Sequence, residues 1–463
     1  MEDITEINMC TYRTKVKHNN YLKPKSLSEL ESFLKSNRLS KHHICSSGRN
    51  WGYGSKLGHE SETTLIDVSE LNKIEINEAH SVITIEPGVT QKALYKRLKE
   101  INSNLMISIT GSSPNTSLIG NMKSHGYGNG RSTVRVEDLL QVNGYDENHN
   151  YVNGIDNSTC KYGDSAISNK IIFNEKSIIT KAKFRLKPIP EKLLLFCFSI
   201  ENEEKFSPLI ERLNYIKGQG LIEGNWSLFS AHRLLAENNS KSKLFSNTAD
   251  ISISFEEARK KLNEFGYNIW TGSYNGVFAC YMPCIEIAKS VEGFISKQLS
   301  NVSDKFLCVN ASKEEIIQER NCGNGFDNIN VEPPILSRLR TFSGILKHGS
   351  MDIIYWAKNQ KLDTQDPDKD KCGFIWNAFS LPNDHKLIRT FMNSINQAFF
   401  EKNLDPIYVI DGVLPHETYF MVSLIYDFDD VKAERQAKDL HRNLNVISNE
   451  LGVVNFKRIT PFE

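Results

Sequence analysis

Hydrophobic and polar residues alternate in a regular way in several short segments of the first part of the chain. In KIEIN (73–77) and SVITIEPG (81–88) hydrophobic residues occupy every second position, which is typical of a strand with one buried face. TTLIDVS (63–69) is another short run rich in β-forming residues. These segments predict three short β-strands close together along the chain.

A helical period follows directly. In VTQKALYKRLKE (89–100), Leu94 and Leu98 recur four residues apart, and Ile101 continues the same face. Thr90 is a suitable N-cap residue for this helix, because its hydroxyl can accept a hydrogen bond from a free backbone N–H of the first turn. Strands and helices in this mixed order predict an α+β domain.

The pattern changes near residue 190. Pro188 and Pro190 end the strand predicted within IITKAKFRLKPIPEK (178–192), and a long apolar run, LLLFCFSI (193–200), begins a new region. We therefore expect a domain boundary near residue 190.

A second α+β domain is expected from residue 191 to residue 451. Its clearest elements are two strands at 374–382 and 419–428 and two helices at 384–403 and 430–451. The last helix has an apolar stripe made of Ala433, Ala437, Leu440, Leu444 and Ile447. A polar loop, DTQDPDKDKCG (363–373), precedes the first of these strands.

Composition narrows the class of protein. The 463 residues include 56 Lys and Arg against 56 Asp and Glu, so no excess of positive charge indicates nucleic acid or an anionic membrane as a partner. The start of the chain is acidic and lacks the apolar core of a secretory signal, and no apolar run could span a bilayer. Nine scattered cysteines without zinc-ligand spacing favour a reduced, cytoplasmic protein with no metal ion.

Two glycine-bearing segments are the main chemical signal. SSGRNWGYGS (46–55) and TGSSPNTSLIGNMKSHGYGNG (110–130) can both expose backbone N–H groups that converge on an anion without a Cβ in the way. Either segment alone would be read as a tight turn. Together they could line a long cleft for a dinucleotide, although neither matches the P-loop or the GxGxxG fingerprint.

These segments carry a resemblance to a known family. SSGRNWGYGS, TTLIDVSELNKI, VITIEPGVTQKALYKRL, GSSPNTSLIGNMKSHGYG and SIITKAKFRLKP occur in this order. The series resembles the FAD-binding domain of the p-cresol methylhydroxylase and vanillyl-alcohol oxidase flavoproteins. YWAKNQ (355–360) and DPDKDKCGFIW (366–376) are similar to the substrate-cap domain of the branch that oxidises aryl alcohols and 4-alkylphenols.

The resemblance implies an α+β fold of two lobes. Residues 1–190 would form the FAD-binding domain of p-cresol methylhydroxylase type, and residues 191–451 a substrate cap with an antiparallel sheet. Residues 452–463 would be a C-terminal tail returning to the flavin region. Relatives continue beyond this point, so either the site is completed differently or a partner closes it.

In this family the two loops wrap the FAD pyrophosphate with backbone amides. The resemblance assigns this role to Ser46, Ser47, Gly48, Arg49, Asn50 and Trp51 in the first loop and to Gly111, Ser112, Ser113, Ser117 and Gly120 in the second. Arg49 adds a permanent cation that suits a diphosphate. Trp51 and Tyr53 could equally be packing residues.

Three further residues complete the cofactor site implied by the resemblance. Gly88 would lie where the loop before the helix approaches the flavin, and Ile178 and Ile179 would hold the adenine end through main-chain hydrogen bonds. Histidines that attach the flavin covalently in relatives are replaced here by Arg49 and Gly373, and the second loop has serines where a linking cysteine would be. We therefore expect FAD to be bound non-covalently, with a lower reduction potential than in a covalent relative.

The candidate catalytic residues are Lys457, Tyr419 and His125. Phenol-oxidising relatives bind the phenolate with a Tyr–Arg pair after the last cap helix, where this chain has Phe456 and Lys457. Lys457 could supply positive charge near the flavin or be an ordinary solvated lysine. Tyr419 could face the flavin from the cap. His125 lies in the second loop and could be either a base or a structural loop histidine.

Two functions follow from these features. The first is an FAD-dependent oxidoreductase that takes a hydride from an alcohol or benzylic carbon of a small substrate and passes electrons to oxygen or to an acceptor protein. The second is an FAD-binding scaffold or inactive subunit, which the replaced tyrosine and the absence of an evident acidic residue near the flavin would favour. The sequence does not name the substrate or the oligomeric state.

Overall fold

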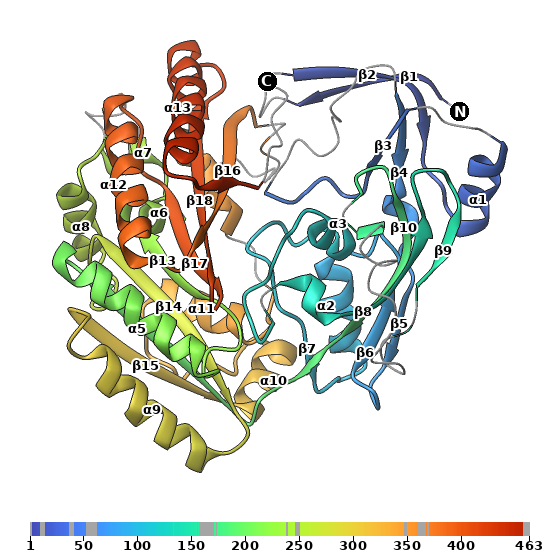
Figure 1. Cartoon of the computed structure of the whole chain (residues 1–463). Helices are drawn as coiled ribbons and strands as arrows, with labels where there is room; N and C mark the ends of the chain where they lie inside the picture. The colour runs from blue at the N-terminus through green and yellow to red at the C-terminus, as the bar shows by residue number, and fades with distance from the viewer. Residues whose placement is uncertain are drawn as a thin grey trace.

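The computed structural model of the chain describes residues 2–9, 14–36, 41–51, 63–132, 134–154, 156, 171–172, 174–237, 239–245, 251–346, 350–358, 367 and 370–456. They form two lobes that face each other across a layer of loops (Figure 1). No helix within these ranges is both long and apolar enough to cross a bilayer.

The first lobe begins with a mixed sheet in the order β1-β2-β4-β3. Its strands are β1 (Glu2–Met9), β2 (Thr14–Leu22), β3 (His42–Cys45) and β4 (Thr64–Asp67). Helix α1 (Leu27–Ser36) buries Leu30 and Leu34 in the same small core as Ile66 of β4. A 3-10 turn, η3 (Val68–Glu70), follows β4 directly. The first loop starts at the end of β3, which pairs in parallel with β4.

A second, antiparallel sheet has the order β5-β6-β10-β8-β9. Its strands are β5 (Ile74–Asn77), β6 (Val82–Ile85), β8 (Leu139–Tyr145), β9 (Tyr151–Asn153) and β10 (Ile178–Arg185). The predicted helix is α2 (Gln91–Glu100), and Thr90 caps it by accepting from the N–H of Ala93 at 3.1 Å. Leu94 and Leu98 are buried as expected, because they face the sheet.

The second loop is not irregular throughout. Residues 118–123 form a short helix, α3 (Leu118–Lys123), which Ser117 caps, and its Leu118, Ile119 and Met122 are buried. Six residues are too few for a helical period to be recognised, so the sequence indicated only a long loop. Another 3-10 turn, η4 (Arg135–Asp138), leads into β8.

The second lobe is built on an antiparallel sheet with eight strands among the described residues, in the order β15-β12-β14-β13-β17-β18-β16-β19. These strands are β12 (Lys192–Ile200), β13 (Trp226–Ser230), β14 (Tyr274–Met282), β15 (Lys305–Ser312), β16 (Cys372–Pro382), β17 (Tyr408–Leu414), β18 (Glu417–Asp427) and β19 (Val454–Asn455). Two of them, β16 and β18, were predicted with nearly these bounds.

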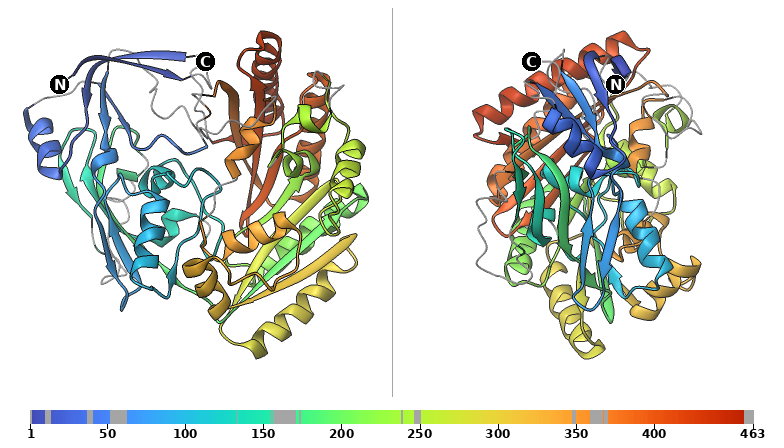
Figure 2. Two further views of the ribbon diagram at one scale, coloured as in Figure 1. Left: turned by 180° about the vertical axis from the view of Figure 1, so that it is seen from behind. Right: turned by 90° about the vertical axis from the view of Figure 1, so that its right-hand side faces the viewer.

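Helices cover both faces of this sheet. The outer layer consists of α5 (Phe206–Gly218), α9 (Ile285–Leu299), α12 (His385–Glu401) and α13 (Val431–Glu450), as the two views of Figure 2 show. The inner layer consists of α6 (Ala231–Ala236), α7 (Lys241–Leu244), α8 (Phe255–Glu264), α10 (Lys313–Cys322), α11 (Pro333–Phe342) and the turn η6 (Ser350–Tyr355). Strand β12 is therefore buried on both faces: Leu193 and Leu195 join the inner core, and Leu194 and Phe196 join the outer one.

The boundary predicted near residue 190 would fall between a short pair of strands, β7 (Leu105–Met106) with β11 (Lys187–Pro188), and strand β12. At the other end, β19 pairs with the edge of β16, so the chain stays with the second lobe at least to residue 456. Residues 457–463, which include Lys457, lie outside the described residues.

Candidate functional site

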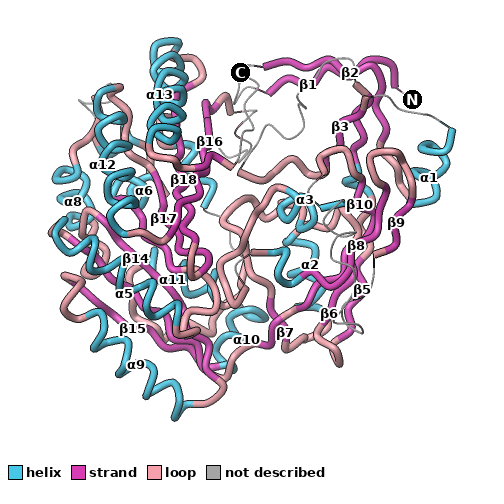
Figure 3. Tube along the Cα trace, viewed as in Figure 1, coloured by secondary structure: helices cyan, strands magenta, loops and turns pink. Residues whose placement is uncertain are grey.

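The two glycine-bearing loops contact each other directly. Thr116 Oγ1 of the second loop donates to the carbonyl oxygen of Arg49 in the first at 2.9 Å, and the N–H of Ser117 donates to Ser47 Oγ at 3.2 Å. Loop segments of the first lobe lie at the junction with the second lobe in Figure 3. The first requirement of a shared diphosphate site, that the two loops lie together, is therefore met.

Several backbone amides in these loops have no hydrogen-bond acceptor among the residues that the structure describes. Within the described ranges, the N–H groups of Ser47, Gly48, Asn50, Ser112 and Ser113 donate no hydrogen bond. Gly48 has a φ of +63°, which glycine adopts readily and other residues rarely do. Clustered, unsatisfied N–H groups at a turn of this kind suit an anionic oxygen. The residues present therefore fit a cofactor that carries phosphate groups.

Two of the predicted serines also brace the loops. Ser46 Oγ and Ser117 Oγ both donate to the carbonyl oxygen of Pro87, at 2.9 and 2.6 Å. Ser117 Oγ accepts in turn from the N–H of Gly120 at 3.0 Å, as the N-cap of α3. These side chains fix the loops, and only the backbone is left to bind a ligand.

Gly88 is tightly packed within the first lobe. A Cβ at this position would lie 2.3 Å from the carbonyl oxygen of Ser69 and 2.6 Å from that of Leu71. Gly88 is buried against the turn that follows β4, so its missing side chain allows close backbone packing. Its approach to the flavin stays a prediction.

The remaining cofactor candidates lie in two places, the second loop and strand β10. A Cβ on Gly111 would be 3.9 Å from Trp51 Nε1, whereas Ser112 Oγ is held by Thr116 Oγ1 at 2.7 Å. Ile178 and Ile179 are buried in β10 and pair with β8 on one side. Since β6 pairs only from Ala182 onwards, the other backbone edge of Ile178 and Ile179 has no strand partner in the described part of the chain.

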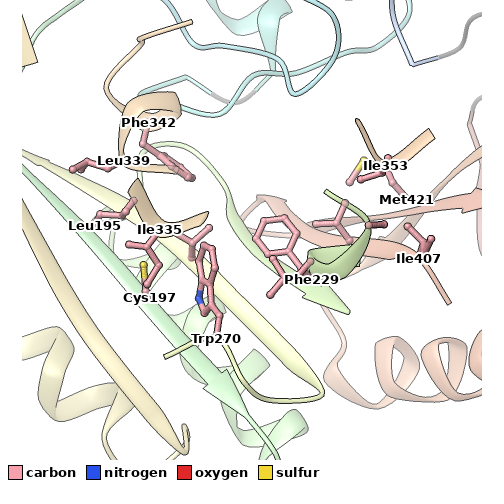
Figure 4. Packing of buried hydrophobic residues seen from close by; sticks show 14 of the residues in the cluster. Leu195, Cys197, Phe229, Trp270, Ile335, Leu339, Phe342, Ile353, Ile407 and Met421 are labelled. Carbon is pink, nitrogen blue, oxygen red and sulfur yellow. The ribbon is translucent and has the colours of Figure 1, made fainter. Parts of the chain in front are cut away.

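A cavity lies between these loops and the sheet of the second lobe. Its lining combines loop residues with residues from β13, β16, β17, β18, α6 and α11. The residues that form it are Asn50, Trp51, Thr110, Gly111, Asn121, Gly126, Tyr127, Asn129, Ser227, Phe229, Arg233, Arg338, Phe342, Trp376, Val409, Asp411, Met421 and Ser423. Phe229, Phe342 and Met421 also belong to the inner core of the second lobe (Figure 4). Trp51 both packs, with its ring 5.9 Å from that of Phe374, and lines the cavity.

A tyrosine and an aspartate meet in this cavity from opposite lobes. Tyr127, at the end of the second loop, donates a hydrogen bond to Asp411 of β17, and its oxygen lies 3.0 Å from the sulfur of Met421. Burial raises the pKa of Asp411 above its ordinary value, although the hydrogen bonds from Ser227 and Tyr127 oppose the shift. Burial also raises the pKa of Tyr127, and the Asp411 carboxyl adds to this. The pair therefore behaves as one buried acid–base unit.

Glycines on both sides of Tyr127 determine where it points. A Cβ on Gly126 would lie 2.1 Å from Asn121 Nδ2, and one on Gly128 would lie 2.6 Å from the carbonyl oxygen of Ser108. The loop can pack this closely only without these side chains. The two glycines thus allow the tightly packed backbone that places Tyr127 against the second lobe.

Two arginines line the cavity near one glutamate. Arg338 of α11 is paired with Glu237, and its guanidinium lies 4.6 Å from the ring centroid of Phe229. Arg233 of α6 lies 4.0 Å from the same carboxylate and 5.7 Å from the ring centroid of Trp51. Both cations therefore lie against aromatic walls of the cavity.

The candidate catalytic residues differ in position. Tyr419 is buried beside the cavity, with its ring in an edge contact with that of Tyr127 at 5.7 Å and tilted against that of Phe456 at 4.6 Å. It contacts the site through Tyr127 and is not part of the lining. His125 is exposed just after α3, with a φ of +52°, and is not part of the cavity lining. Lys457 lies outside the described residues.

Gly373 does not point at the cavity either. A Cβ there would meet the Tyr426 ring at 2.2 Å, on the outer face of the sheet, whereas Phe374 points inwards to Trp51. Because side chains alternate along a strand, the inward positions of β16 are Cys372, Phe374 and Trp376.

Both the sequence and the fold resemble those of known flavoproteins. Residues 19–143 match the family model of an FAD binding domain. The chain is 25% identical to a 1'-carboxy-chondrochloren decarboxylase from Chondromyces crocatus. The alignment covers 88% of this chain and 77% of that protein. It is also 25% identical to the flavoprotein subunit of a 4-cresol dehydrogenase from Pseudomonas putida, across 42% of this chain and 40% of that protein. A solved p-cresol methylhydroxylase structure superposes with a TM-score of 0.80 and 16% identity, covering 97% of this chain and 83% of the other.

The chain carries an FAD-binding domain and has the fold of p-cresol methylhydroxylase. In this flavoprotein the α+β fold of two lobes agrees with the prediction, and FAD is the cofactor. The sequence did not reveal the cavity residues Asp411, Arg233 and Arg338. One signal was available: Asp411 is a carboxylate in the otherwise apolar strand YVIDGVL, and a charge in such a place is costly unless it is paired.

Proposed function

We propose that the flavoprotein oxidises a small molecule with an apolar body by removing a hydride from an alcohol or benzylic carbon. The observation that supports this most directly is the Tyr127–Asp411 pair, which lies in a cavity beside the two cofactor loops. Removal of a hydride requires a group that accepts the substrate's hydroxyl proton, and a buried carboxyl with a raised pKa suits this task.

We propose that FAD is held mainly by backbone amides of residues 47–50 and 111–113, with Arg49 compensating the diphosphate charge. Bound FAD would supply the acceptor for the hydride. The main-chain edge of Ile178 and Ile179 is the proposed contact for the adenine end. We also propose a domain boundary near residue 190, with residues 1–190 binding the cofactor and residues 191–451 forming the cap.

Asp411 and Tyr127 would handle the proton. A substrate hydroxyl placed next to Tyr127 would pass its proton to the Asp411 carboxylate, either directly or through the tyrosine hydroxyl. Trp51, Phe229 and Phe342 would exclude water around the reacting carbon, which strengthens electrostatic interactions at the site. Tyr419 would position the Tyr127 ring through their edge contact.

A second candidate is oxidative decarboxylation. It is suggested by the name of the decarboxylase relative and by the arginines that line the cavity. In such a reaction a hydride leaves one carbon, the carboxylate on the neighbouring carbon departs as carbon dioxide, and the electron pair of the broken C–C bond forms the new double bond. The cofactor would be the same, but this reaction releases no proton, so the two candidates differ in the substrate and in whether Asp411 acts as a base.

The scaffold alternative is less well supported. An inactive FAD-binding subunit has no need of a buried acid–base pair in a cavity beside the cofactor loops. The proposed electron acceptor is oxygen or a partner protein; the cresol dehydrogenase relative is named as a flavoprotein subunit. A cytoplasmic location and a homo-oligomer stay predictions.

An anaerobic reduction screen tests the proposed function. We expect visible flavin absorbance to bleach with at least one member of a panel of alcohols, 4-alkylphenols and phenyl-substituted carboxylic acids, with carbon dioxide measured for the acids. Amines serve as negative controls. A yellow protein that every compound leaves oxidised would favour the scaffold.

The mode of flavin attachment gives a separate prediction. Neither Arg49 nor Gly373 can form the histidine links of relatives, and Gly373 points away from the cavity. Acid precipitation should therefore release the yellow colour into the supernatant. Colour that stays with the pellet would show a covalent link, and peptide mapping would then test Cys372 first, since it is on the inward face of β16.

A further inference from the structure

We propose that Arg233 and Arg338 form a carboxylate-binding subsite, so that the substrate is an aromatic or similarly apolar molecule bearing a carboxylate. Only the claim that the bound molecule is the substrate rests on the proposed function. Binding of a carboxylate at this subsite can be tested without turnover. The inference is carried by the geometry of the two arginines in the interlobe cavity.

The guanidinium group of Arg233 is buried and makes no hydrogen bond within the described part of the chain. Its side chain is 9% exposed, its one ion pair is at 4.0 Å, and among the described residues its guanidinium donates to no acceptor. The Nε of Arg338 is likewise buried and without a partner there. Unsatisfied donors in a buried site are costly, because they have lost their hydrogen bonds to water. A ligand that brings acceptor atoms would relieve this cost.

The charges favour an anion. Arg233 and Arg338 share the single carboxylate of Glu237, so neither guanidinium has a carboxylate of its own. Asp411 is the other acidic group near Arg233, but it accepts from Tyr127 and forms no ion pair or hydrogen bond with Arg233 among the described residues. The guanidinium is planar and can give two parallel N–H groups, which match the two oxygens of a carboxylate.

The walls define the rest of the ligand. Trp51, Phe229, Phe342 and Met421 line the cavity beside the arginines, so the carboxylate would extend from an apolar or aromatic body. Tyr127 and Asp411 line the same cavity and would meet the reacting part of the molecule. The cavity thus offers an anionic end, an apolar middle and a proton acceptor to one ligand.

Titration of the oxidised holoprotein with phenylacetate tests the subsite. Binding is read from the change in the visible flavin spectrum, and phenylacetamide is the neutral control of the same shape. We expect phenylacetate to bind at least about tenfold more tightly, since the charged hydrogen bonds are lost in the amide. Arg233→Gln should remove this preference and leave phenylacetamide binding unchanged. Absence of phenylacetate binding, or equal affinity for both compounds, would overturn the subsite.

Arg131→Gln is the matched control. Arg131 also pairs with a glutamate, Glu223, and also lies over an aromatic ring, that of Tyr281, but it does not line this cavity. It should leave the preference for phenylacetate intact. A lowered flavin reduction potential in Arg233→Gln with an unchanged preference would show that Arg233 serves the flavin instead, and would also overturn the subsite. Since no substrate is oxidised in these titrations, failure of the proposed function would leave their outcome unaffected.

Discussion

Gly48→Val should yield a folded protein that has lost most of its FAD. At a φ of +63° a β-branched residue is strained by about 1–3 kcal/mol, and relief of that strain would rotate the amides of residues 47–50 away from a common anion. We expect FAD to bind about ten- to a hundredfold more weakly. The measurement is a titration of FAD into apoprotein, followed by the quenching of flavin fluorescence.

A matched glycine separates this effect from general strain. Gly220 also has a positive φ, +75°, with no atom near its missing Cβ, and it lies in the second lobe. Gly220→Val should cost similar stability and bind FAD normally. Full FAD affinity in Gly48→Val would mean that the first loop does not hold the diphosphate.

Asp411→Asn should retain its FAD and lose at least about a hundredfold in kcat, because an amide cannot accept the substrate's proton. Tyr127→Phe should show a smaller loss, since it leaves the carboxylate in place. Rapid-mixing measurement of flavin reduction under anaerobic conditions isolates this step. It requires a substrate from the reduction screen.

The pH dependence gives an independent reading of Asp411. The group works only when ionised, and burial raises its pKa above the ordinary 3.8. The rate of flavin reduction should therefore fall as the pH drops through this raised value, with an acid limb above the ordinary aspartate range, and be constant above it. In Asp411→Asn the limb should disappear. Persistence of the same limb would assign it to another group.

Tyr355→Phe is the matched control for the pair. Tyr355 donates to Asp370 at 2.5 Å in another buried Tyr–Asp contact of the same lobe, outside the cavity lining. Its loss should lower the melting temperature and leave the rate of flavin reduction near that of the wild type. A large rate loss here would mean that the effect of the Asp411 and Tyr127 variants reflects general damage to the lobe.

Local patterns predicted the framework of the fold well. Strands β5, β6, β16 and β18 and helices α2, α12 and α13 lie close to their predicted bounds, because each buries one face or stripe that its own sequence shows. The α3 helix escaped notice because it is too short to show a period. The order of β-strands in the two larger sheets depends on contacts far apart along the chain, which periodicity does not encode.

The site was only partly predictable for the same reason. The glycines in the sequence indicated the two loops and predicted that they lie together. The contacts that Thr116 and Ser117 make with the first loop agree with this prediction. In the sequence, Gly88 could not be distinguished from the glycines of the two loops. Only the short distances from its missing Cβ to Ser69 and Leu71 reveal that it is needed for close packing. Asp411 and the two arginines come from three separate elements, and nothing local marks them as neighbours.

Tyr127 and Asp411 belong to opposite lobes, so their hydrogen bond forms only when both lobes are present. A graft that joined this cofactor half to the cap of a different relative would inherit the tyrosine and lose the acid. Such a chimaera would still be yellow and still admit small molecules, but it would react slowly. Activity could be restored by returning one carboxylate to the recipient strand, which makes this single cross-lobe contact the minimal feature to transplant when the cap is exchanged.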